Sequence, residues 1–187
     1  MSFALFCHYL LAWVLAIAAL QKCRSWRQFV ANLQQLLPMP YTLATRFSAL
    51  LIATEALLAI TLWLPGAWWR FSAGLTLVLF IGFSGFIIWL LRSGRRFSCQ
   101  CFGHSQQPLG KADLYRSALL LALALAMLSV EQAALVAFSV AASGVEQLLL
   151  ISCALLWALQ LIALPQWWSW FADDADDVAD DNAGEHQ

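Results

Sequence analysis

The sequence predicts an all-α integral membrane protein, a bundle of four transmembrane helices followed by a fifth helix and an acidic tail. Hydrophobic residues make up 62% of the 187 residues and charged residues only 11%, and the mean hydropathy is +0.73. These values lie outside the range of soluble globular domains. We therefore expect the lipid bilayer to surround most of the chain, and the composition gives no support for nucleic-acid binding.

The predicted transmembrane helices correspond to five apolar runs. The first run, residues 3–20, is followed rather than preceded by basic residues, which favours a retained helix over a cleaved signal peptide. Residues 132–145 either extend the fourth helix past Glu131 or lie along the membrane interface, and their length favours the extension. The other four runs cover residues 47–64, 71–91, 114–130 and 147–171.

The runs divide the chain into three parts. The last run contains no charge and ends in the Trp-rich segment PQWWSWF, a composition typical of residues at the membrane interface. The end of the chain is rich in aspartate, and such segments are usually disordered. The predicted parts are a transmembrane bundle over residues 1–140, an additional transmembrane helix over 141–171 and a disordered acidic tail over 172–187.

Basic residues are distributed unevenly between the predicted loops. Nine of the ten lie in the loops after the first and third helices, and only Arg70 lies on the other side. Loops rich in Lys and Arg resist translocation. We expect a multi-pass protein of the bacterial inner membrane, with these basic loops in the cytoplasm and the N-terminus in the periplasm.

Of the five cysteines, only Cys99 and Cys101 are close in sequence, within RRFSCQCFGH. A disulfide across one intervening residue closes a small, strained ring, and strain makes a disulfide easier to reduce. Arg95 and Arg96, together with either Lys111 or His104, would favour the reactive thiolate. The pair therefore indicates thiol–disulfide exchange, whereas Cys7 and Cys153, in apolar helices, are expected in the core.

Two other interpretations of the cysteine pair remain open. Cys99 and Cys101 would line a tight turn, with Gly103 allowing a positive φ. Alternatively they would bind zinc together with His104, although the spacing is shorter than in the usual zinc modules. The exchange interpretation predicts no bound metal and no cofactor, and quinone use does not follow from the sequence.

Glu55 is an ionisable residue close to the expected bilayer midplane. A charge there is costly, so we expect Glu55 to face the bundle interior and either pair or carry protons. The alternative is an interhelical hydrogen bond made by a protonated carboxyl. Lys22, at the end of the first helix, is expected to extend to the membrane interface, and Arg116 opens the fourth helix as a possible topology anchor. Because thiol exchange also moves protons, Glu55 would serve as its base or relay.

Several of these residues recur together in a known family. They are Lys22, Phe29, Leu36-Leu37-Pro38, Glu55, Leu91-Arg92, Cys99-Gln-Cys-Phe-Gly and Arg116. On these features, residues 3–130 resemble the MauE family of methylamine-utilisation membrane proteins, which is related to the DoxX group. The sequence differs from the family in having Gln100 between the cysteines, where glycine is frequent, and in its additional fifth helix.

The resemblance implies a DoxX-like four-helix bundle that helps to mature a periplasmic enzyme. In the family's name-giving case this client is the small subunit of methylamine dehydrogenase. A periplasmic thioredoxin-like partner is also implied. Carried over by position, Cys99 and Cys101 are the redox pair, and Glu55, Lys22 and Arg116 are supporting polar residues.

Two functions are consistent with these residues. The first is a membrane thiol–disulfide redox protein, acting as an oxidoreductase or an electron relay. Because the basic loops place Cys99 and Cys101 toward the cytoplasm, a relay would carry reducing equivalents outward, unless the topology rule fails and the cysteines face the periplasm. The second is a non-catalytic membrane scaffold or chaperone for a secreted partner, with cysteines that fix a turn or bind a metal.

Overall fold

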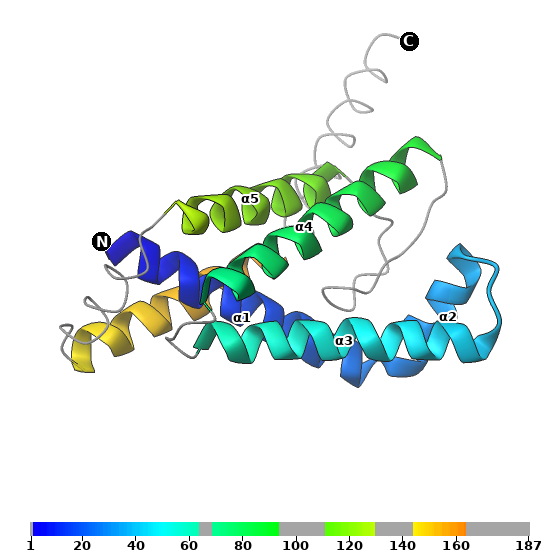
Figure 1. Cartoon of the computed structure of the whole chain (residues 1–187), viewed down its shortest axis with the longest axis horizontal. Helices are drawn as coiled ribbons and strands as arrows, with labels where there is room; N and C mark the ends of the chain where they lie inside the picture. Colours follow the sequence, from blue (N-terminus) through cyan, green and yellow to red (C-terminus); the bar gives the residue numbers. More distant parts are fainter. Residues whose placement is uncertain (1, 64–68, 94–110, 130–143, 164–187) are drawn as a thin grey trace, which may run out of the picture.

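The computed structural model describes residues 2–63, 69–93, 111–129 and 144–163. Within these ranges the chain is helical and contains no strand, which confirms the predicted all-α class (Figure 1). The helices in chain order are α1 (Ser2–Arg24), α2 (Trp26–Leu36), α3 (Tyr41–Trp63), α4 (Trp69–Arg92), α5 (Lys111–Leu128) and a final helix, Gly144–Ala163. The acidic tail and residues 132–143 lie outside the described residues.

Four of the described helices are long and apolar enough to cross a membrane. These are α1, α3, α4 and Gly144–Ala163. The fourth helix expected from the sequence, α5, is not among them, because its 18 described residues begin with Lys111, Asp113 and Arg116. The chain is therefore a multi-pass membrane protein with four candidate spans in its described part.

Helix α2 lies where the sequence analysis expected only a basic loop. Ser25 separates α1, which ends at Arg24, from α2, which begins at Trp26. Its hydroxyl donates a 2.8 Å hydrogen bond to the Gln21 carbonyl. The apolar residues of α2 recur at helical spacing, and Phe29 and Val30 are buried. The helix ends before Leu37, which is extended because the following residue is a proline.

Helix α3 begins at Tyr41, six residues before the predicted start at Phe47. The carbonyl of Pro40 accepts hydrogen bonds from the amides of Leu43 and Ala44, so this proline stands at the helix N-terminus, where it needs no amide of its own. Along α3 the buried residues recur every three or four positions from Ala44 to Leu62. Glu55 belongs to this buried face.

The core of the bundle forms around α1. Its buried side chains, from Leu5 to Leu15, form one apolar cluster with residues of α3, α4 and α5. Ala154, Ala158 and Leu161 of the final helix belong to the same cluster, so Gly144–Ala163 packs onto the bundle. In Figure 1, α4 and α5 lie side by side while α1 crosses α3, and these are the two most extensive helix pairs.

Candidate functional site

Lys22 of α1 and Glu55 of α3 form a buried ion pair. The Lys22 Nζ lies 2.5 Å from Oε1 and 2.6 Å from Oε2 of Glu55. Only 1% of Lys22 and 6% of Glu55 is exposed. The expectation that Lys22 extends to the interface is therefore wrong, because its ammonium turns inward to a carboxylate. Of the alternatives for Glu55, facing the interior and pairing is the one observed.

Burial of this pair is not explained by stability alone. Removing two charges from water costs several kcal/mol, and a buried ion pair can often be replaced by apolar residues without loss of stability. Ionisable residues inside membrane helices usually mark a functional pathway. The Lys22–Glu55 pair is therefore the first element of the candidate site.

Arg116 of α5 is the second element. It is only 4% exposed, and its guanidinium donates a 2.7 Å hydrogen bond to the carboxylate of Asp113 one turn earlier. Arg116 also lies within electrostatic range of the Lys22 ammonium. Three helices therefore bring Lys22, Glu55 and Arg116 to one buried region, which we call the charge cluster, together with Asp113. A role for Arg116 as a topology anchor in the lipid headgroups does not fit this burial.

The charge cluster offers two kinds of chemistry. A carboxylate can accept and release protons, which is the task of a general base or a proton relay. Lysine and arginine cations stabilise an anion such as a thiolate that forms near them. Because the two cations are balanced by two carboxylates, a thiolate that forms nearby is compensated when Glu55 takes up the proton that the thiol releases.

The predicted redox pair and its neighbours lie outside the described residues. These are Cys99, Cys101, Gly103 and His104. The segment that carries them connects Arg92, the last residue of α4, to Lys111, the first residue of α5. Arg116 is therefore close to the cysteines in sequence. In the described part of the chain, no group of three or more His, Cys, Asp or Glu residues could hold a metal ion.

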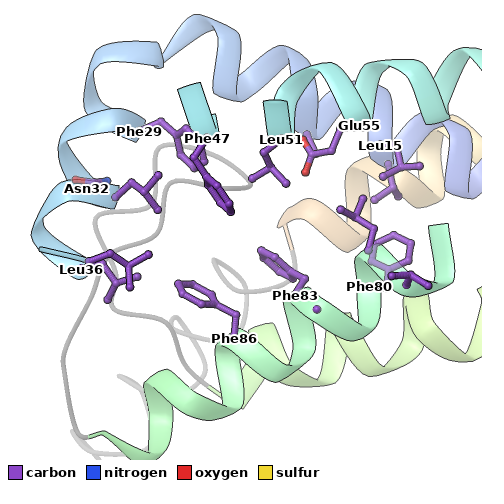
Figure 2. A pocket seen from close by; sticks show the side chains of 17 residues that line it. Leu15, Phe29, Asn32, Leu36, Phe47, Leu51, Glu55, Phe80, Phe83 and Phe86 are labelled. Atoms are coloured by element: carbon purple, nitrogen blue, oxygen red, sulfur yellow. The ribbon is translucent and has the colours of Figure 1, made fainter. Parts of the chain in front are cut away.

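An apolar cavity of about 470 Å³ lies between α1, α2 and α3 on one side and α4 on the other (Figure 2). Glu55 is one of its lining residues, so the cavity and the charge cluster share a carboxylate. Asn32 of α2 is the other side chain of the lining with a polar group. Phenylalanine rings form much of the wall, from Phe29, Phe47, Phe80, Phe83 and Phe86.

A comparison with models of known protein families shows to which family the chain belongs. The family model described as methylamine utilisation protein MauE matches residues 1–130. This chain belongs to the MauE family. The match confirms the resemblance and covers the charge cluster and the cysteine pair, while the Gly144–Ala163 helix lies beyond it. No curated protein and no solved structure matches the chain significantly.

The three remaining cysteines of this MauE protein differ in environment. Cys7 is buried in α1, as expected for a small hydrophobic side chain, and only 1% of it is exposed. Cys153 was also expected in the core but is exposed, because it lies on the side of its helix away from Ala154 and Ala158. Cys23 is exposed beside buried Lys22.

Two features of this MauE protein were not predicted from the sequence. His8 is buried inside the α1 span, where it forms a hydrogen bond with the backbone of Leu62. A histidine within an apolar run is the signal that could have identified it. The cavity was also missed, although the regular spacing of Phe80, Phe83 and Phe86 places three rings along one side of α4.

Proposed function

We propose that this MauE protein is a membrane thiol–disulfide redox protein that supports disulfide formation in a periplasmic enzyme. Cys99 and Cys101 are its redox pair, and Lys22, Glu55 and Arg116 are its supporting polar residues. The proposed client is the small subunit of methylamine dehydrogenase, in keeping with the family description, and a periplasmic thioredoxin-like protein is the proposed partner. The proposed location is the bacterial inner membrane.

The observation that carries this proposal is the convergence of Lys22, Glu55 and Arg116 inside the bundle. Three buried charged residues from three helices are expensive, and thiol–disulfide exchange needs what they supply. A cysteine must lose a proton to become the nucleophile, and cations favour the resulting thiolate. The Glu55 carboxylate supports the proposal as an acceptor for that proton.

The proposed exchange oxidises the partner, which is the opposite direction to the outward relay, and it requires the segment with Cys99 and Cys101 to be reached from the periplasm. It proceeds in two steps. A thiolate of the partner attacks the Cys99–Cys101 disulfide, forms a mixed disulfide and releases one cysteine thiolate, which takes up a proton. The partner's second thiolate then attacks the mixed disulfide and releases the other cysteine. The partner gains a disulfide, and the Cys99–Cys101 pair gains two electrons and two protons.

The test follows the redox state of the pair in cells that produce the client. Thiols are trapped by acid quenching and labelled with maleimide, and disulfides in the client are measured in parallel. We expect Cys99→Ser and Cys101→Ser each to abolish client disulfide formation while the membrane abundance of the protein is unchanged. Cys153→Ser, an exposed cysteine in a helix beyond the family match, is the matched control and should have no effect.

The opposite result would favour a different function. If both substitutions leave the client disulfides intact, or only lower the abundance of the protein, the cysteines are structural. The non-catalytic scaffold or chaperone would then be the better explanation. A pair that stays in one redox state when oxidant or reductant is added would point the same way.

A further inference from the structure

The cavity beside the charge cluster has the features of a small-molecule site. Its volume of about 470 Å³ falls within the range of roughly 300–1,000 Å³ that ligand pockets occupy. Such pockets are mostly apolar, with a few polar groups that orient the ligand. Here Glu55 and Asn32 are the polar side chains, and the other lining residues are apolar apart from Gly82.

The position of the cavity determines how a ligand reaches it. Its lining residues belong to the candidate membrane spans α1, α3 and α4 and to the intervening helix α2. Phe47 and Val78 of the lining are more than half exposed on the lipid-facing side of the chain. A ligand that enters from the bilayer must therefore be soluble in lipid.

The aromatic wall favours a flat ring over a saturated chain. In Figure 2, Phe47 and Leu51 of α3 face Phe83 and Phe86 of α4 across the cavity. Aromatic side chains bind other rings in offset or edge-to-face geometry, which adds to the burial of apolar area. An acyl chain would gain the apolar contact alone.

Glu55 favours a ligand that carries a hydrogen-bond donor. Lys22 donates to both oxygens of this carboxylate, yet each carboxylate oxygen has two acceptor positions, so each can accept a further hydrogen bond. A hydroxyl on a ring could donate to it. The phosphate of a phospholipid and the carboxylate of a fatty acid are anionic, and the Glu55 carboxylate would repel either group at close range.

We propose that the cavity binds a membrane quinone, with its ring between the phenylalanines of α3 and α4 and a ring oxygen toward Glu55. A membrane quinone is lipid-soluble and flat, and its reduced form, the quinol, carries a ring hydroxyl that can donate a hydrogen bond to the Glu55 carboxylate. The ligand is the two-electron acceptor that restores the Cys99–Cys101 disulfide, and this redox role, unlike the binding itself, rests on the proposed function. In the balanced step, two thiols and one quinone give one disulfide and one quinol, with two electrons and two protons transferred.

Two glycines of α4 provide a matched pair of variants. A Cβ at Gly82, which lines the cavity, or at Gly74, which does not, would meet no atom within 4 Å. Gly82→Leu therefore places a side chain toward the cavity, and Gly74→Leu adds the same bulk elsewhere on the same helix. Thermal unfolding of both variants checks that the fold is retained.

The experiment uses the full chain in lipid nanodiscs that lack quinone. The probe is a benzoquinone with a short saturated tail, tested both oxidised and reduced to the quinol, since only the quinol can donate a hydrogen bond to Glu55. The competitor is the same alkyl tail without the ring. We expect the probe to bind, Gly82→Leu to weaken binding about tenfold and Gly74→Leu to leave it unchanged. Equal displacement by the alkyl tail would overturn the proposal in favour of an acyl-chain site, as would unchanged binding in a folded Gly82→Leu variant.

A second measurement does not depend on either variant. An aryl-azide derivative of the same quinone is photolysed on the wild-type chain, and labelled peptides are identified by mass spectrometry. Labelling within residues 47–55 of α3 or 78–86 of α4 supports the proposal, and labelling confined to residues outside the cavity lining contradicts it.

The two proposals fail in different ways. A chain with both Cys99→Ser and Cys101→Ser should bind the probe as the wild type does, because the residues proposed to hold the ring belong to α3 and α4. If the cysteines cycle in cells but the quinone does not bind, only the cavity proposal fails. If the quinone binds but the cysteines stay in one redox state, only the proposed function fails.

Discussion

Lys22 and Glu55 are 33 positions apart in the sequence, and both carboxylate oxygens of Glu55 accept a hydrogen bond from the Lys22 ammonium. The contact joins the cytoplasmic end expected for α1 to the buried face of α3. It joins a carboxylate that stood alone in an apolar run and a lysine that was expected at the membrane interface into one ionic unit.

Removal of one member of the pair should destabilise the protein more than replacement of both. Lys22→Met leaves a buried carboxylate without its partner, for which we expect a loss of about 3–5 kcal/mol. The double variant Lys22→Met with Glu55→Leu leaves no unpaired charge and should lose less. Reversible unfolding in mixed micelles measures the free energy of unfolding of the wild type, the single variant and the double variant.

The same variants separate structure from function. We expect the double variant to reach near wild-type abundance and yet to fail in client disulfide formation. Normal activity in the double variant would mean that the pair only holds α1 to α3.

Ser84 of α4 and Ser117 of α5 should contribute a small interhelical coupling. Their hydroxyl oxygens are 2.6 Å apart, and Ser117 is buried. Hydrogen bonds between membrane helices average about 0.6 kcal/mol in double-mutant cycles, because the unfolded chain in the membrane also finds partners. A cycle of Ser84→Ala and Ser117→Ala should give a value near this, and a coupling indistinguishable from zero would argue against the contact.

Cysteine labelling should report the orientation of the bundle. Cys23 is exposed and flanked by Lys22 and Arg24 at the end of α1, while Cys7 is buried near its start. With the other cysteines replaced by serine, we expect an impermeant maleimide to label Cys23 from the cytoplasmic side only and Cys7 from neither side. Labelling of Cys23 from the periplasm would invert the predicted topology.

A larger side chain where the helix Gly144–Ala163 packs onto α1 should destabilise the packing of the two helices. Ala158 has no exposed surface and belongs to the same cluster as Leu11 and Leu15 of α1. Overpacking a filled core costs about 1–3 kcal/mol, so Ala158→Leu should lower the melting temperature. Leu159→Ala, on the exposed side of the same helix, is the control and should change it little.

The sequence by itself determined the features that depend on local composition. The four candidate spans of the described residues followed from apolar runs, since hydropathy over about 20 residues decides whether a helix enters lipid, whereas α5 was also predicted as a span and is not among them. Glu55 stood out because a charge in such a run is rare, and the short motifs that include Cys99 and Cys101 identified the MauE family. The amphipathic spacing of α2 was also readable, but its polar residues led to its interpretation as a loop.

The tertiary structure alone decided which residues meet. Nothing in the sequence near Lys22 indicates that its partner lies on α3, because a single helix can orient a side chain but cannot specify what faces it. The burial of Arg116 likewise depends on α5 packing in the bundle, and the cavity exists only where rings from α2, α3 and α4 stand apart. Contacts between distant segments are set by packing of whole helices, and packing is a property of the assembled chain.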